Sequence, residues 1–90
     1  MKLLFVCMGN ICRSPTVAAV ARVEFVRAGI SVDVDSGGTE RYHVGASADR
    51  RSIAIAEANG YPLASHRARQ VCAADFSRFD HLLVMDRINH

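Results

Sequence analysis

The sequence KLLFVCMGNICRSP, residues 2–15, decides the fold, because it joins a short apolar run to a helix-start signal. Residues 2–6 are rich in large apolar side chains, a composition that is typical of a buried β-strand. Residues 7–13 contain a glycine and an asparagine, which favour a loop. Ser14 and Pro15 then supply a helix N-cap residue and a proline at the first helical position. This stretch therefore predicts a strand, a short loop and the start of a helix.

Strand and helix signals alternate through the rest of the chain as well. In chain order, we expect the first helix at Ser14–Ala28, a second strand at Ser31–Ser36, a loop at Gly37–Gly45, a second helix at Ala48–Asn59, a short third helix at Arg67–Ala74 and a third strand at His81–Met85. Such alternation is typical of parallel sheets with right-handed crossover connections. We therefore predict the α/β class, with a three-layer parallel sheet and helices on both of its faces.

Length and composition limit the possible partners. We expect the ninety residues to form one domain, spanning 1–90. Eleven basic and nine acidic residues leave a net charge of +2, which is too small to argue for nucleic acid or a membrane surface. The first apolar run, Leu3–Met8, is far too short to span a membrane and does not read as a signal peptide. The three cysteines have neither a disulfide pattern nor metal-ligand spacing, so we expect a cytoplasmic protein with no metal and no cofactor.

The loop at residues 7–13 has the features of a phosphate site. Backbone N–H groups and the positive end of the helix dipole would converge on the space inside this loop. Gly9 permits the backbone conformation of such an anion-binding nest, and Asn10 can brace it with its side-chain amide. Arg13, at the start of the helix, can donate two hydrogen bonds to phosphate oxygens. The predicted ligand is therefore an anion of the size of phosphate.

Cys7 would lie at the floor of this loop, where the helix N-terminus, the loop N–H groups and Arg13 favour its thiolate form. A thiolate that faces phosphorus is a nucleophile, and it would form a phosphocysteine intermediate. Ser14 could hydrogen-bond the sulfur and help it leave, while Arg13 would stabilise charge on the equatorial oxygens. A bare Cys-x5-Arg spacing is common, so an inert buried thiol at the end of a strand stays open as the alternative for Cys7.

Residues 6–15 resemble the phosphate-binding loop of the low-molecular-weight protein tyrosine phosphatases. Four further segments resemble motifs of this family in the same order, namely Asp35–Thr39, His43–Asp49, Ser65–Arg69 and Met85–Asn89. The resemblance covers the whole chain. It implies the phosphotyrosine-phosphatase I-like fold, phosphomonoester hydrolysis on phosphotyrosine proteins or small aryl phosphates, and inorganic phosphate as a competitive ligand.

The resemblance also assigns roles to individual residues. It implies Cys7 as the nucleophile and Arg13 as the phosphate clamp, with loop support from Asn10, Ser14, Ser36 and His66. The substrate-binding positions that it implies are Met8, Gly9, Asn10, Ile11, Cys12 and Tyr42. Ile11 stands where relatives that act on phosphoarginine tend to carry threonine, so it favours phosphotyrosine. Tyr42 could stack on the phosphotyrosine ring at the rim of the cleft, or it is a plain exposed loop tyrosine.

Two further cysteines raise separate questions. Cys12 matches the second loop cysteine of the family, which can form a reversible disulfide with Cys7 under oxidation. A simple loop-filling role for Cys12 is equally open. Cys72 matches no residue with a family role, and its apolar surroundings predict a core position.

The family's other parts have no counterpart in these 90 residues. They are a fourth strand, a final helix and an Asp-Pro loop whose aspartate protonates the leaving tyrosine. No aspartate here precedes a proline, so we assign no general acid, a group typically worth about 10²–10⁴-fold in rate. We expect the front part of the family fold, with weak or impaired turnover. The apolar third strand would then be an exposed edge that favours self-association.

Two other functions stay open at this point. A non-catalytic module could bind phosphate or a phosphoprotein in a regulatory role, and its anion binding would survive Cys7→Ser. A thiol-based arsenate reductase is close in fold, but it needs a second cysteine pair downstream, which Cys72 alone does not provide.

Overall fold

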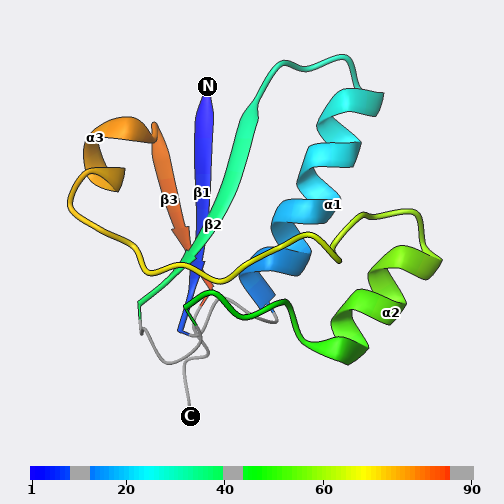
Figure 1. Cartoon of the computed structure of the whole chain (residues 1–90). Helices are drawn as coiled ribbons and strands as arrows, with labels where there is room; N and C mark the ends of the chain where they lie inside the picture. The colour runs from blue at the N-terminus through cyan, green and yellow to red at the C-terminus, as the bar shows by residue number, and fades with distance from the viewer. Residues whose placement is uncertain (9–12, 40–43, 86–90) are drawn as a thin grey trace, which may run out of the picture.

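The computed structural model describes residues 1–8, 13–39 and 44–85. In chain order its elements are β1 (Lys2–Cys7), α1 (Arg13–Arg27), β2 (Asp33–Gly38), α2 (Arg50–Ala58), α3 (Asp75–Arg78) and β3 (His81–Val84). The three strands form one parallel sheet in the order β2-β1-β3. Figure 1 shows α1 and α2 on one side of this sheet and α3 on the other. The predicted α/β class, parallel sheet and helices on both faces are confirmed.

β1 occupies the centre of the sheet because its side chains are apolar on both faces. Leu3, Leu4, Val6 and Cys7 are all buried, as expected for a parallel strand with neighbours on both edges. In the register of the sheet, Val6 lies opposite a residue of β2 and a residue of β3. The carboxyl ends of the three strands therefore meet at one edge of the sheet, where Cys7 ends β1.

The first two helices pack together as well as on the sheet. α1 packs on β1, β2 and α2, and a small apolar cluster joins Ala19 of α1 to Ala48, Ala56 and Leu63. Glycines follow both helices with positive φ, 74° at Gly29 and 85° at Gly60. This left-handed conformation is typical of a residue just past a helix end, which confirms where the two helices were predicted to stop. No helix of the described residues is long and apolar enough to cross a membrane.

Three starting points differ from the expectation by one or two residues. α1 begins at Arg13, so Ser14 lies inside its first turn rather than at the N-cap. β2 begins at Asp33 rather than at Ser31. α2 begins at Arg50 rather than at Ala48, because Asp49 is its N-cap and the Asp49 carboxylate accepts a hydrogen bond from the Ser52 N–H at 3.1 Å.

The prediction that a loop begins at Gly37 is wrong, because Gly37 and Gly38 are the last residues of β2. The N–H of Gly38 donates to the Arg69 carbonyl, and the Gly38 carbonyl accepts from the Val71 N–H, both at 2.8 Å. A Cβ atom on Gly37 would lie 2.8 Å from Cγ2 of Val71. Pairing with a distant segment thus extends the strand through two residues whose local signal is that of a loop.

The prediction of a helix at Arg67–Ala74 is also wrong, again because this segment pairs with residues that are distant in the chain. Arg67 and Gln70 form isolated β-bridges with Ser47 and Gly38, and α3 begins only at Asp75. Cys72, which we expected in the core, is exposed. The segment runs along the edge of the sheet beside β2, and its apolar residues therefore do not form the buried face of a helix.

Candidate active site

Cys7 and Ser14 meet where β1 ends and α1 begins. Sγ of Cys7 lies 3.0 Å from Oγ of Ser14, and the contact is buried. The exposed fractions are 3% for Cys7 and 0% for Ser14. Because Ser14 is the second residue of α1, the first turn of this helix places a hydroxyl group directly beside the thiol. Such a contact can stabilise a thiolate when the hydroxyl donates its proton toward sulfur.

The start of α1 is electrostatically suited to an anion. The helix has 15 residues and no acidic residue in its first turn, so no carboxylate of that turn offsets the positive end of its dipole. Arg13 is the first residue of the helix and is exposed, which leaves a cationic side chain at this end. The N-terminus of α1 beside Cys7 is therefore suited to an anionic ligand.

Backbone hydrogen bonds fix the strand ends on both sides of Cys7. The Cys7 carbonyl accepts from the Thr39 N–H at 3.0 Å, just past the end of β2. The carbonyl of Val6 accepts from the Met85 N–H at 2.6 Å, just past the end of β3. The peptide groups before and after Cys7 are thus each hydrogen-bonded to the end of a neighbouring strand.

Ser36 and His66 were predicted as loop-support residues. Ser36 is buried on β2, opposite Phe5 of β1 in the register, and its N–H donates to Oδ1 of Asp35 at 2.8 Å. His66 is half-buried in the segment that follows α2, and its N–H donates to the Leu63 carbonyl at 3.1 Å. These contacts fix the backbone of both residues, while their support of the loop stays a prediction.

The other predicted site residues lie at or beyond the limits of the described chain. Met8 is exposed directly after β1. Gly9, Asn10, Ile11, Cys12 and Tyr42 lie outside the described residues. Their assignment to substrate binding, and that of Cys12 to redox chemistry with Cys7, therefore stay predictions.

One cavity lies beside the first turn of α1. Its volume is about 260 Å³, and it is lined by Arg13, Thr16, Val17, Ser52 and Met85. A larger cavity of about 560 Å³ lies farther along α1, where Arg22, Val23 and Val26 face Pro62 and Ser65. The larger space is not lined by Cys7 or Ser14, so cavity size alone does not point to the candidate site.

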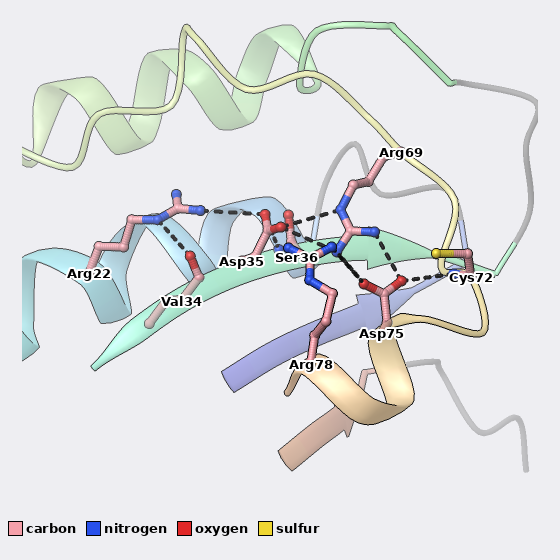
Figure 2. A network of polar contacts seen from close by, with 8 residues as sticks. All are labelled: Arg22, Val34, Asp35, Ser36, Arg69, Cys72, Asp75 and Arg78. Atoms are coloured by element: carbon pink, nitrogen blue, oxygen red, sulfur yellow. Dashed lines mark hydrogen bonds and ion pairs between the residues drawn. The ribbon is translucent and has the colours of Figure 1, made fainter. Parts of the chain in front are cut away.

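A buried acidic residue that the sequence did not single out lies near the end of β2. Asp75, the first residue of α3, has an exposed fraction of 0%. Its carboxylate accepts two hydrogen bonds from the Arg69 guanidinium, at 3.0 and 3.1 Å (Figure 2). Hydrogen bonding from Arg69 holds the pKa of Asp75 below its ordinary value. Arg69 belongs to a segment that resembled a family motif, which is the signal that could have led to this pair.

Comparison with known proteins places the whole chain in one family. A family model described as low molecular weight phosphotyrosine protein phosphatase matches residues 2–90. The human protein of that name is 44% identical over 88 residues, which cover 96% of this chain and 55% of the human protein.

Solved structures agree with this match. A protein tyrosine phosphatase from Entamoeba histolytica superposes with a TM-score of 0.90 at 42% identity, over 97% of this chain and 56% of that one. The Drosophila arginine phosphatase superposes with a TM-score of 0.91 at 34% identity, over 96% and 55% respectively. This chain thus spans little more than half the length of these relatives. It belongs to the low molecular weight phosphotyrosine protein phosphatase family.

Proposed function

We propose that residues 1–90 form a cysteine-dependent phosphatase domain that hydrolyses phosphomonoesters of tyrosine. The observation that carries this proposal is the 3.0 Å contact between Sγ of Cys7 and Oγ of Ser14 at the N-terminus of α1. A helix N-terminus, a thiol and a hydroxyl group together match the needs of thiolate attack on a phosphate.

In the proposed reaction, the Cys7 thiolate attacks phosphorus and the bond from phosphorus to the tyrosine oxygen breaks. This step leaves phosphocysteine on the protein. A water molecule then attacks phosphorus, the sulfur–phosphorus bond breaks, and inorganic phosphate leaves. The Ser14 hydroxyl group stabilises the departing thiolate, and Arg13 binds the phosphate oxygens in both steps.

The remaining assignments complete the proposed site. The loop positions Met8, Gly9, Asn10, Ile11 and Cys12 surround the phosphate, Tyr42 contacts the aromatic ring, and Ser36 and His66 support the loop. We assign no general acid among these 90 residues, so this chain by itself should hydrolyse esters with good leaving groups faster than phosphotyrosine. Inorganic phosphate competes with the substrate.

The choice between phosphotyrosine and phosphoarginine rests on a single position. The similarity to the Drosophila arginine phosphatase makes phosphoarginine the second candidate substrate. Ile11 favours phosphotyrosine, and the two substrates can be compared directly in one assay. A non-catalytic phosphate-binding module is the second kind of function, while the arsenate reductase is not favoured by the comparisons.

Location and assembly are parts of the same proposal. Cys72 is an exposed free thiol, which suits a reducing compartment such as the cytoplasm. Leu83 and Val84 of β3 have exposed fractions of 42% and 67%. Within the described residues β3 pairs with β1 alone, so its outer edge could pair with a second copy of the chain.

Release of nitrophenol from nitrophenyl phosphate tests the proposed activity. We expect Cys7→Ser to lower turnover by at least about 10³-fold, because the nucleophile is lost. Cys72→Ser is the matched control, since it removes an exposed thiol, and it should leave turnover unchanged. Phosphate and vanadate should both raise the unfolding temperature of the wild type. A wild type that binds neither anion and releases no nitrophenol would sink the proposal, whereas anion binding without any turnover would favour the non-catalytic module.

A further inference from the structure

Asp75 is a buried charged residue that the proposed reaction does not use. Its carboxylate accepts from both Nη1 and Nη2 of Arg69 and, at 2.8 Å, from the backbone N–H of Cys72. The Arg78 guanidinium lies 3.9 Å away. Removing a carboxylate from water is costly unless it is paired, and here the pairing is extensive. The contacts also raise the pKa of Arg69, first of all through the hydrogen bonds to Asp75.

Arg69 connects this carboxylate to the sheet. Its Nε donates to Oδ2 of Asp35 on β2 at 3.3 Å, and its Nη2 lies 3.2 Å from the same oxygen. Figure 2 shows the guanidinium between Asp35 on one side and Asp75 on the other. The side chain of Arg69 therefore links the start of α3, at Asp75, to Asp35 on β2. Arg22 of α1 reaches Asp35 from its other side, at 3.8 Å.

The backbone of Arg69 leads from this ion-pair cluster to the candidate site. Its carbonyl accepts from the Gly38 N–H at 2.8 Å. The next residue in the chain, Thr39, lies just past the end of β2 and donates its N–H to the Cys7 carbonyl at 3.0 Å. Two backbone hydrogen bonds thus separate the residue held by Asp75 from the residue that carries the thiol.

We propose that Arg69 and Asp75 are positioning residues for the candidate active site, which hold the end of β2 and through it the end of β1 at Cys7. The inference rests on the proposed function and adds two residues that act on it from a distance. A displacement of about 1 Å at a reacting group can cost about 10²-fold in rate, so small shifts of the strand ends matter.

Two variants separate positioning from mere stabilisation. Asp75→Asn removes the charge and keeps the size of the side chain. Arg69→Lys keeps the charge and loses the two-pronged geometry, and it is the milder change if the first variant fails to fold. Glu24→Gln is the matched control, because Glu24 also pairs with an arginine, Arg27, but belongs to an exposed pair on α1. All four proteins are compared at a temperature at which each is fully folded.

Amide hydrogen exchange and phosphate binding are the two measurements. In Asp75→Asn we expect the amides of Gly38, Thr39 and Val71 to exchange at least tenfold faster, while the amide of Met85 keeps its protection. Phosphate should bind at least tenfold more weakly, and kcat for nitrophenyl phosphate should fall by about 10–100-fold. Arg69→Lys should show the same pattern with smaller changes, and Glu24→Gln should show none.

Unchanged exchange at Gly38 and Thr39 in a folded variant would overturn the inference, even if the variant melts at a lower temperature. Equal loss of protection at Met85 would overturn it too, because that result describes general loosening. If the wild type neither binds phosphate nor hydrolyses the ester, the proposed function fails. Exchange at Thr39 then still decides whether Asp75 positions the strand end at Cys7.

Discussion

Gly37→Ala is the substitution that most directly tests the packing at the end of β2. The added Cβ atom would lie 2.8 Å from Cγ2 of Val71 and 3.7 Å from the Val71 nitrogen. Gly37 does not have a positive φ, so alanine brings no backbone strain and its effect comes from this contact. Val71 is β-branched and therefore stiff at χ1, so it cannot simply turn away.

The expected cost follows from the distance. Carbon atoms in ordinary contact are about 3.5–4.0 Å apart, so the side chain of Val71 or its backbone must move by more than half an ångström. Overpacking of this kind costs about 1–3 kcal/mol of unfolding free energy. In a domain of this size, each kcal/mol lowers the midpoint of thermal unfolding by about 4–8 °C.

A double-mutant cycle provides the assay. Thermal and denaturant unfolding are measured for the wild type, Gly37→Ala, Val71→Ala and the double variant. Val71→Ala removes the methyl group in the way, so Gly37→Ala should cost at least about 0.5 kcal/mol less in that background. The reasoning is refuted if Gly37→Ala changes the unfolding free energy by less than about 0.5 kcal/mol, or if the two effects simply add.

Three shorter predictions concern the site, pH and assembly. Ser14→Ala removes a hydrogen bond to the thiolate, worth about 1.5–3 kcal/mol, so kcat for nitrophenyl phosphate should fall by about 10–100-fold; a change within twofold would contradict the role of Ser14. Because Arg69 lowers the folded-state pKa of Asp75, the stability from Asp75 is full above the unfolded-state pKa of about 4 and is lost as pH falls through the lower folded-state value. Denaturant unfolding below about pH 4 should therefore show a steeper loss of stability for the wild type than for Asp75→Asn, and equal slopes would speak against the pairing. Val84→Lys should shift any dimer toward monomer in sedimentation equilibrium, and a wild type that is monomeric at high concentration would rule out self-association through β3.

The parts of the fold that could be predicted from sequence are those with local signals. β1 is an apolar run followed by a loop signal, so its existence as a buried strand follows from its own residues. The stops of α1 and α2 follow from Gly29 and Gly60, because glycine adopts the positive φ of a helix end without steric cost. These elements were placed within a few residues because local chemistry alone decides them.

The failures share a nonlocal cause. The glycine pair at the end of β2 signals a turn by itself, and only the approach of Val71 shows why it is strand. The segment at residues 67–74 has enough apolar residues to suggest a helix, but its backbone bonds to Ser47 and Gly38 instead. Neither pairing can be read from the segment itself, because the partner lies more than 15 residues away in the chain.

The candidate site divides in the same way. Cys7 and Ser14 are seven residues apart and joined by one strand-to-helix connection, so their contact follows from local order. Asp75 could not be singled out, because an aspartate is normally exposed and its burial depends on meeting Arg69. The burial of Asp75 could be predicted only by knowing which arginine pairs with it, and the sequence does not show this.

Gly37 and Gly38 connect the Cys7–Ser14 contact with the Arg69–Asp75 ion pair. Because Gly37 has no side chain, the segment with Arg69 can approach the end of β2 closely enough for two backbone hydrogen bonds to Gly38. The same approach brings the Arg69 guanidinium over Asp35, where Asp75 completes its pairing. Thr39, the residue after the pair, then donates to the carbonyl of Cys7. A side chain at position 37, whose Cβ atom would lie 3.8 Å from Cζ of Arg69, would therefore disturb the ion-pair cluster and the strand end at the thiol together.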